Sequence, residues 1–488
     1  MNKILLIINS LSTENRQNFI LWLKNKNRRG DVKNVILFNY LLKGETNALD
    51  VKLYGKPNKN AFHALCKRLQ DSLLDFIATK SFEGETSEEL EVLKLLVVSR
   101  LFLEQKEYKL GYNTLARAEK LASFIDHYSL LNEIYHTKIQ YAHCNPLVDL
   151  NTTFKLADSN MEAFQKDFKL NMAYAEIKEK ILITKSLEKI DTIVETAFTK
   201  YKVSINASLS YKSLYQLMNI TSVTAKLQRN YYRITPFIEE AYAIVNSKET
   251  LAHKHLYYHI GILQVMAMVH FRNKSFKKSM AFVAKMEKEM LKNKKAYYKR
   301  FLADVTVLKV LNYNYTGNFN KALQILSKNK TEALDIQLIH TMCFFQQNRF
   351  RDAYSIIKKL YHSDIWYEKK AGWLWVLKKS ILEILLLIEL DELDLVLLRV
   401  KSFRIKFKER LIAIKEERVL TFIQLALTFY ESPKNVNTPS FKERVERSFD
   451  WKDNREEDIY VMSFYAWLKA KMENRELYTT TLELVSSQ

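Results

Sequence analysis

The sequence predicts an all-α protein built from antiparallel helical hairpins. Only 8 glycines and 5 prolines occur among 488 residues, whereas average usage is about 7% and 5%. Sheet-containing folds need these residues at frequent tight turns, while helical hairpins can turn on Asn, Lys or Ser. Long stretches also carry apolar residues at helical spacing, and 48% of all residues are hydrophobic, which is ample for a core. We therefore expect at least two-thirds helix and essentially no strand.

A short pattern that recurs in the second half of the chain predicts individual hairpins. An aromatic residue is followed three positions later by a small one, at Phe319 and Ala322 and again at Phe350 and Ala353, and Gly317 ends the helix before the first copy. The small residue lets the two helices of a hairpin approach closely, because a larger side chain would hold them apart.

Weaker copies place Gly111, Ala241 and Ser279 at the same close-contact position. Positions 241, 279, 322 and 353 are 38, 43 and 31 residues apart, close to a repeat period of about 34. The pattern resembles the tetratricopeptide repeat (TPR). This resemblance implies a TPR-like α-solenoid with helices of unequal length, and such solenoids commonly bind peptides or helices on a concave surface.

Helical spacing also predicts the extent of each helix. Breaks are expected at Gly84, Pro146, Gly317 and in the Ser-Pro-Lys-Asn-Val-Asn-Thr-Pro stretch at 432–439, which is the best linker. We expect a module at 1–86, repeats at 87–431 and a helical cap at 440–488. The expected helices lie near residues 12–26, 32–43, 58–80, 87–104, 107–124, 128–143, 149–168, 170–185, 187–202, 209–228, 235–247, 250–272, 275–292, 296–315, 319–328, 332–347, 350–361, 368–388, 391–408, 411–430, 440–448 and 456–473.

Residues 1–86 lack the repeat and are predicted to form a three-helix basic module. In its third helix, Lys59, His63 and Lys67 form a stripe on one face. Two interpretations remain: a reader of DNA, or a cap over the open face of the first repeat. The long linker before the third helix favours the cap. The other face of this helix is apolar and carries Phe62, Leu65, Cys66, Leu69, Leu73, Phe76 and Ile77.

Part of this module resembles the opening of a group of uncharacterised bacterial TPR proteins. The resemblance is carried by Leu11-Ser12 with Arg16 and Phe19, then by Leu53-Tyr54-Gly55 and Leu65-Cys66-Lys67-Arg68-Leu69. It extends over roughly the first 100 residues and implies no activity.

The net charge of +21 is concentrated in three stretches. Lys and Arg outnumber Asp and Glu by 14 to 6 in residues 1–80, by 11 to 2 in 272–300 and by 8 to 3 in 399–418. Such clusters attract phosphates or acidic proteins, and Tyr297 and Tyr298 would suit base stacking. The candidate contacts are Arg28, Arg29, Lys56, Lys59, Lys67, Lys292, Lys294 and Lys295.

The sequence predicts no catalytic, cofactor or metal site. The glycines are never clustered as in a phosphate-binding loop. Two groups with the elements of a metal site, His253 with His255 and His259, and His136 with His143 and Cys144, are expected to be packed side chains. The cysteines at 66, 144 and 343 are odd in number and widely spaced, so neither a disulfide framework nor a zinc site is implied. Trp366, Tyr367, Trp373 and Trp375 are expected in the core, with a peptide groove as the alternative.

These observations favour a non-enzymatic scaffold or adaptor that binds a protein or peptide partner. The alternative is nucleic-acid association, either DNA binding through residues 1–80 or RNA and ribosome association through the basic stretches. The apolar run at 381–400 is interrupted by acidic residues, so no membrane span is expected. Residues 1–8 do not have the form of a signal peptide, and free thiols suit a reducing compartment, so we expect a cytoplasmic protein.

Overall fold

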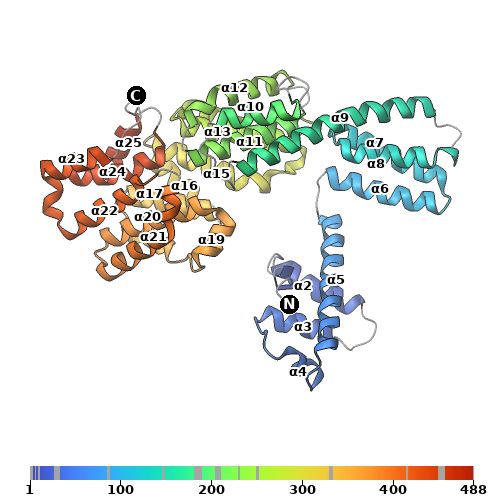
Figure 1. Ribbon diagram of the computed structural model, residues 1–488, viewed down its shortest axis with the longest axis horizontal. Helices are drawn as coiled ribbons and strands as arrows, with labels where there is room; N and C mark the ends of the chain where they lie inside the picture. The colour runs from blue at the N-terminus through green and yellow to red at the C-terminus, as the bar shows by residue number, and fades with distance from the viewer. Residues whose placement is uncertain are drawn as a thin grey trace. The chain divides into compact units, whose positions relative to one another are not determined.

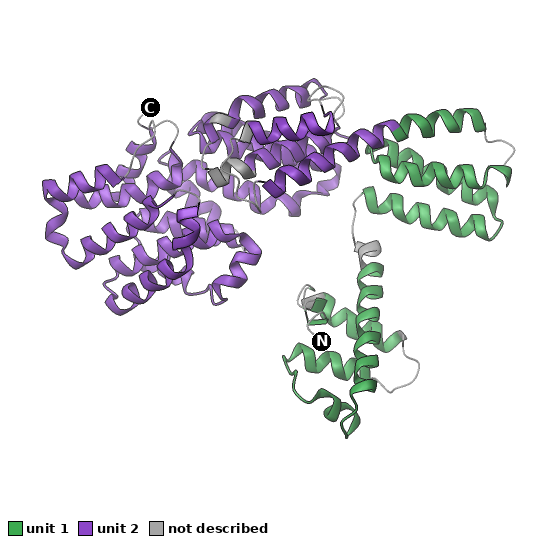
Figure 2. Ribbon diagram, viewed as in Figure 1, with its two compact units in different colours: residues 1–161 green, residues 162–488 purple. Residues whose placement is uncertain are grey.

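The computed structural model confirms the all-α prediction. It describes residues 4–5, 7–8, 11, 13–26, 33–84, 88–144, 149–180, 190–203, 210–228, 231–248, 252–328, 333–413, 416–448 and 457–486. Within these ranges every regular element is a helix and no strand occurs (Figure 1). The chain forms two compact units, residues 1–161 and 162–488 (Figure 2). The predicted boundaries near 86 and at 432–439 each lie inside one of these units.

The first unit begins with a helical module and continues with three further helices and part of a fourth. Its elements are α2 (Thr13–Lys26), α3 (Lys33–Leu42), α4 (Leu49–Tyr54), α5 (Lys59–Gly84), α6 (Glu88–Glu104), α7 (Tyr108–Phe124), α8 (Tyr128–Gln140), the 3-10 turn η1 (Ala142–Cys144) and α9 (Leu150–Lys178), which crosses into the second unit.

The apolar face predicted for α5 is confirmed as its packing face. Leu65, Cys66, Leu69, Leu73 and Phe76 are buried in one core with residues of α2 and α3. The prediction of three helices in this module was wrong, because the expected linker contains the short helix α4. This helix forms because Leu49 and Leu53, one turn apart, both bury their side chains in the same core.

The second unit contains consecutive helices that pack in pairs. They are α10 (Ile190–Tyr201), α11 (Tyr211–Gln228), α12 (Tyr231–Ser247), α13 (Leu256–Arg272), α14 (Phe276–Met290), the 3-10 turn η4 (Asn293–Lys295), α15 (Tyr298–Tyr315), α16 (Phe319–Lys328), α17 (Leu334–Gln346), α18 (Phe350–Ile357), α19 (Asp364–Ala371), α20 (Trp373–Glu389), α21 (Leu393–Ala413), α22 (Arg418–Glu431), the 3-10 turn η5 (Pro433–Asn437), α23 (Pro439–Ser448), α24 (Ile459–Glu473) and α25 (Leu477–Ser486).

Six of the hairpin turns share one backbone structure. Each turn has three residues, and the middle one adopts a left-handed conformation with φ between 50° and 80°. The next residue donates its backbone N–H to the carbonyl five positions earlier, at 2.8–3.0 Å. This hydrogen bond satisfies a carbonyl that the end of the helix would otherwise leave without a partner. Only one of the six positions is a glycine, which explains how so many turns form with so few glycines: Lys106, Asp126, Lys274, Gly317, Asn348 and Asp391.

The small residues of the sequence pattern lie five positions after four of these turn residues. Gly111, Ser279, Ala322 and Ala353 are all buried at the crossing of two helices. A Cβ atom at Gly111 would lie 2.7 Å from Leu103 Cγ on α6. The Ser279 hydroxyl donates to the Ala267 carbonyl on α13 at 2.8 Å. Ala241, which lies on α12, is also buried. Side chains at these positions set how closely paired helices approach.

Two expected boundaries were wrong, whereas the break expected at 432–439 does separate α22 from α23. The helices expected near 149–168 and 170–185 are the single helix α9, because no glycine or proline interrupts this segment. The helix expected near 368–388 is divided into α19 and α20 by Gly372, whose φ of 85° is incompatible with a helix. The predicted linker at 432–439 contains the turn η5, which is anchored because Val436 is only 4% exposed.

The C-terminal helices fold back onto the middle of the second unit. The carboxylate of Asp458 pairs with Arg272, 186 positions earlier. Tyr315 and Ser463 share a hydrogen bond of 2.7 Å, and the Tyr478 hydroxyl donates to the Asn314 carbonyl at 2.6 Å. In a simple linear solenoid each repeat contacts only its neighbours. Contacts over such sequence distances therefore place α24 and α25 within the core of this unit.

Candidate functional site: a polar cavity in the second unit

A cavity of about 320 Å³ lies among the inner helices of the second unit. Helices α11, α13, α15, α17, α20 and α24 line it, and Tyr231 from the start of α12 contributes one further side chain. All six helices are the first members of consecutive pairs, so the second members form the outer layer. The volume lies within the range of about 300–1,000 Å³ that is usual for ligand sites.

Arg272 is a buried cation that lines this cavity. Its side chain is only 5% exposed, and its guanidinium carbon lies 4.7 Å and 4.8 Å from the ring centroids of Tyr231 and Tyr460. One terminal nitrogen pairs with Asp458, whereas Nε has no hydrogen-bond partner among the described residues. The two rings and the ion pair hold the guanidinium in place, and one donor remains unsatisfied.

Two further lining residues have polar atoms without partners. The Asn314 Nδ2 donates to Gln346 Oε1 at 2.6 Å, but the Asn314 Oδ1 receives no hydrogen bond from the described residues. Trp375 is 4% exposed, and its Nε1 has no acceptor in the described part of the chain. A buried polar atom without a partner costs about 1–3 kcal/mol. Arg272, Trp375 and Asn314 thus line one cavity and carry two unsatisfied donors and one unsatisfied acceptor, each of which is itself covered by protein atoms.

One lining residue of the cavity is acidic. Asp335 lies in the first turn of α17, where the helix dipole favours a negative charge. Asp304 on α15 does not line the cavity but lies near Gln264, a lining residue of α13. Burial, and then the negative charge of Asp335, raise the pKa of Asp304 to about 6, while Arg300 and Gln264 act in the opposite direction. A cation between these two carboxylates would relieve their repulsion.

The remaining reactive groups of the cavity are poorly suited to catalysis. Burial raises the pKa of the Cys343 thiol to about 12, so almost no thiolate exists at neutral pH. The Lys378 Nζ lies 3.3 Å from the ring centroid of Tyr460 and is held by this contact. A smaller cavity of about 60 Å³ lies beside the larger one and shares Arg272, Lys378 and Tyr460 with it.

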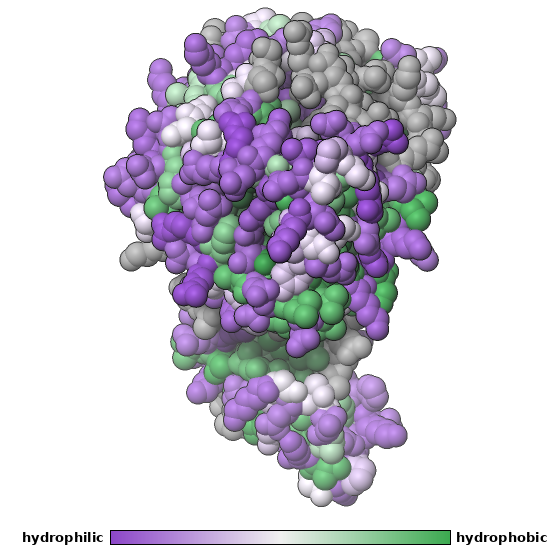
Figure 3. Space-filling view, turned by 90° about the vertical axis from the view of Figure 1, so that its left-hand side faces the viewer, coloured by the Kyte–Doolittle hydropathy of each residue, from purple (hydrophilic) through white to green (hydrophobic). Residues whose placement is uncertain are grey.

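None of the basic residues singled out from the sequence lines the cavity. Lys56, Lys59 and Lys67 are exposed on the first unit. In the second unit, Lys292 pairs with Glu289 at 2.7 Å, and Lys294 and Lys295 are exposed. Arg28 and Arg29 lie outside the described residues. Figure 3 shows many hydrophilic side chains among the described residues on one face of the molecule.

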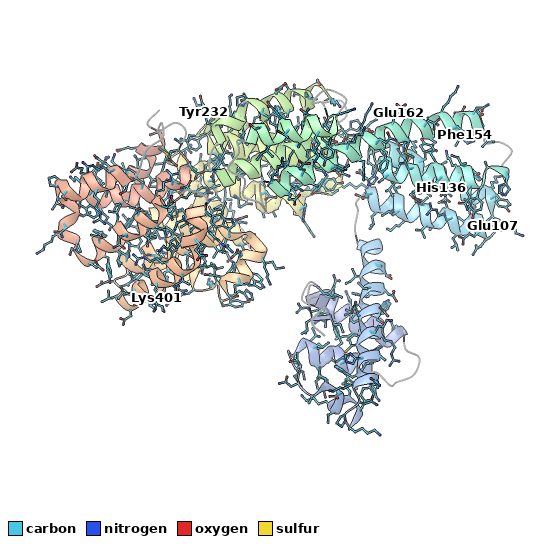
Figure 4. The ribbon with its side chains drawn as sticks, in the orientation of Figure 1. Glu107, His136, Phe154, Glu162, Tyr232 and Lys401 are labelled. Carbon is cyan, nitrogen blue, oxygen red and sulfur yellow. The ribbon has the colours of Figure 1, made fainter. Side chains whose placement is uncertain are left out.

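Much of the basic charge at 399–418 belongs to ion pairs within the fold. Arg399 contacts Glu383 at 3.0 Å, and Arg418 contacts Glu457 at 2.8 Å. Lys401 of the same stretch is exposed on α21 (Figure 4). In the stretch at 272–300, Tyr297 packs on Tyr257 with ring centroids 5.6 Å apart, so it is not free to stack on a base.

His255 and His259 take part in packing, but the expectation that the other histidines of the two groups are packed was wrong, because His136, His143 and His253 are exposed. His255 stacks on Tyr211 with ring centroids 5.0 Å apart, and His259 meets the same ring edge-on at 6.1 Å. His136 is exposed on α8 (Figure 4), beside a shallow hollow lined by Arg100 and Glu133. Across the described ranges, no three His, Cys, Asp or Glu side chains are placed to hold a metal ion.

The aromatic cluster packs in the core, as expected, and one of its members also lines the cavity. Tyr367 and Trp375 are buried and stack with ring centroids 5.3 Å apart, and Trp366 and Trp373 pack against the same core. Trp375 also lines the cavity. It is therefore at once a core residue and part of the cavity wall.

The cavity was not predicted from the sequence, because its walls come from segments that are distant along the chain. One signal was available: Gly261 lies within a helical pattern, where glycine is unfavourable. A Cβ atom at this position would lie 2.5 Å from Cε2 of Tyr215, a lining residue of α11. Gly261 thus marks the close approach of α11 and α13 that places Tyr215 at the cavity.

No described helix is both long and apolar enough to cross a membrane. The sequence matches no family model, and comparison with curated proteins and with solved structures finds no match.

Proposed function

We propose that this protein is a non-enzymatic, TPR-like adaptor of the cytoplasm that binds a peptide segment of a partner protein in the cavity of its second unit. The observation that carries the proposal is the cavity itself, which has a volume of about 320 Å³ and is lined by aromatic, aliphatic and amide side chains. A peptide backbone offers carbonyl acceptors and N–H donors at short intervals, so it can pair with amide side chains such as Asn219 and Gln264.

The composition of the walls supports a peptide ligand. Aromatic and aliphatic side chains such as Tyr215, Leu311 and Trp375 alternate with amide side chains such as Asn219 and Gln264. Apolar walls with a few directed polar groups are typical of ligand sites. A binding role also agrees with the poor reactivity of Cys343.

The test compares the protein with a variant whose cavity is filled. Asn219 lines the cavity from α11 but is exposed, so Asn219→Trp adds bulk with little cost to folding. The matched control is Lys277→Trp, at an exposed site on the outer helix α14. Immobilised protein is mixed with random-sequence tetrapeptides, and retained peptides are counted by mass spectrometry.

We expect the wild type and Lys277→Trp to enrich the same peptides and Asn219→Trp to retain at least tenfold less, which corresponds to about 1.4 kcal/mol of binding free energy. No enrichment by the wild type, or equal enrichment by both variants, would contradict the proposal.

Nucleic-acid association is the second candidate, and one observation favours it. Lys56, Lys59 and Lys67 are all exposed, and no ion pair joins them to another described residue. If they contact phosphates, replacing these three lysines, Arg28 and Arg29 with Ser should make binding less sensitive to salt. The slope of log K against log salt concentration should become shallower by about 0.7–0.9 for each lost contact. Charge reversal of Lys292, Lys294 and Lys295 asks the same question of the second unit. We expect only weak binding to RNA or DNA at 150 mM salt, unchanged in both variants; micromolar affinity that the first variant loses would favour this candidate.

A further inference from the structure

Helix α21 carries a row of exposed aliphatic side chains on its outward face. Leu398, Ile405 and Ile412 are spaced seven residues apart, and their exposed fractions are 58%, 77% and 45%. At about 3.6 residues per turn, this spacing keeps all three on one line along the helix, about 21 Å long at 1.5 Å per residue. The line runs opposite the buried stripe that joins α21 to the core: Val396, Val400, Phe403, Phe407 and Leu411.

Neighbouring helices contact α21 on both sides of its buried stripe. On one side, Arg399 pairs with a carboxylate of α20 at 3.0 Å, and Lys406 pairs with a carboxylate of α19 at 3.3 Å. On the other side, Arg404 donates to a side-chain amide oxygen of α22. The aliphatic row lies between these contacts, where no described residue covers it. Single exposed aliphatic residues are ordinary on a protein surface, whereas contiguous ones mark interaction sites.

Two lysines flank the aliphatic row and differ from the other basic residues of α21. Four of the six basic residues of this helix bond to other parts of the fold: Arg399, Arg404, Lys406 and Arg410. Lys401 and Lys408 are exposed and form no ion pair within the described ranges. They are also seven residues apart, so both lie on the same flank of the row. The outward face thus combines an apolar row with two positive charges that the fold itself does not use.

These charges disfavour a second copy of the chain as the occupant of this face. Antiparallel packing of two α21 helices about Ile405 would place Lys401 of each copy beside Lys408 of the other, and parallel packing would place each lysine beside its own counterpart. Both arrangements bring like charges together, which is unfavourable. An anionic membrane is disfavoured too, because the exposed carboxylates of Asp394 and Glu409 lie on the same face and would be repelled.

We infer that the outward face of α21 binds an amphipathic helix of a partner protein. That helix carries aliphatic side chains at seven-residue spacing, which pack on the exposed row, and acidic side chains on the flank that meets Lys401 and Lys408. A contact of about 21 Å corresponds to about 14 residues of the partner helix. The cavity of the second unit is lined by other helices, so this surface is independent of the proposed peptide site and adds a second contact for a partner.

The experiment offers synthetic helix-forming peptides to the full-length protein. Each peptide has about 21 residues and three leucines seven positions apart, and the positions on one flank of the leucines are either all Glu or all Lys. Binding of each fluorescent peptide is measured by anisotropy at 150 mM salt. We expect the Glu peptide to bind at least tenfold more tightly than the Lys peptide, because only its flank complements Lys401 and Lys408.

Variants of the protein locate the contact. Ile405→Asp should weaken binding of the Glu peptide at least tenfold without unfolding the protein, because Ile405 is the most exposed residue of the row. Lys401→Glu combined with Lys408→Glu should reverse the preference in favour of the Lys peptide, which a merely destabilised fold would not do. The matched controls are Leu291→Asp, at an exposed aliphatic residue at the end of α14, and Lys277→Glu, at an exposed lysine of the same helix. Neither should change binding.

Equal affinity for the two peptides, absence of binding to either, or binding that Ile405→Asp and the charge reversal leave unchanged would overturn the inference. A dimer of the protein that Ile405→Asp dissociates, measured by sedimentation, would overturn it in favour of a second copy. Binding to vesicles of phosphatidylcholine and phosphatidylserine that the same variant loses would overturn it in favour of a membrane. The cavity variant Asn219→Trp should still bind the Glu peptide, so failure of the proposed function would leave this result intact.

Discussion

The ion pair of Arg272 with Asp458 should hold the C-terminal helices on the second unit. Both side chains are nearly buried, at 5% and 3% exposure. Asp458 also caps α24, because its Oδ1 accepts the Tyr460 N–H at 2.9 Å. Asp458→Asn keeps an oxygen for this cap and removes only the charge, so it leaves the guanidinium without a counterion.

Removing one partner of a buried pair costs about 3–5 kcal/mol, since the remaining charge stays buried. The cation–π contacts of Arg272 with Tyr231 and Tyr460 persist in the variant and do not offset this loss. We therefore expect Asp458→Asn to destabilise the docking of α24 by about 3–5 kcal/mol. A double variant that also carries Arg272→Met should lose less than the single variants combined, because the unpaired charge is gone.

Hydrogen exchange of the full-length protein measures this effect locally. Protection of the α24 amides should fall by a factor of roughly 10² to 10³ or more, at about 1.4 kcal/mol per factor of ten. Amides of α5 in the first unit serve as the internal reference. The control is Glu443→Gln, which breaks the exposed pair with Arg447 and should cost at most about 1 kcal/mol. Unchanged protection of α24 in Asp458→Asn would refute the assigned role of the pair.

Three further outcomes are expected. Ala322→Leu and Ala353→Leu should each destabilise the fold by about 1–3 kcal/mol, because both sites are fully buried at helix crossings; unchanged unfolding midpoints in urea would mean that these crossings are not close. Lys106→Gly should stabilise the first unit by about 0.5–1 kcal/mol, because Lys106 is exposed with a φ of 64° and an L-residue is strained there; a lower thermal midpoint would contradict this. Asp304→Asn should stabilise the protein at pH 7.5 and not at pH 4. Its raised pKa means that the ionised carboxylate opposes folding above about pH 6, by about 1–2 kcal/mol once partial exposure is allowed for; an equal gain at both pH values would argue against a charge effect.

The features that the sequence predicted well are those encoded by neighbouring residues. The scarcity of glycine and proline indicated an all-α fold, and the aromatic-to-small spacing located Ala322 and Ala353, because each hairpin contact joins residues close in sequence. The apolar face of α5 was readable for the same reason. Most of the left-handed turn positions carry ordinary polar residues such as Lys106 and Asn348. The same residue types are common on exposed helix surfaces, so they do not identify a turn in the sequence.

The cavity and the return of α24 could not be predicted, because both depend on contacts between distant segments. Arg272 meets Asp458 over 186 positions, and neither residue has a distinctive local pattern. Trp375 was identified only as part of an aromatic cluster, since its role in the cavity depends on α13, α15 and α17. The charge pattern was partly misleading as a guide to binding surfaces, because basic residues such as Arg418 form ion pairs within the fold.

The indole N–H of Trp375 provides a direct measurement of peptide binding in the cavity. The protein has 6 tryptophans, so ¹⁵N-tryptophan labelling yields few side-chain signals, and Trp375→Phe assigns the relevant one. Trp467, whose Nε1 already donates to Glu389, serves as the internal reference. On titration with tetrapeptides at pH 7, the Trp375 signal should move as a peptide occupies the cavity that this side chain lines, while the Trp467 signal stays in place. Saturable peptide binding that leaves the Trp375 signal unmoved would contradict the assignment of this cavity as the binding site.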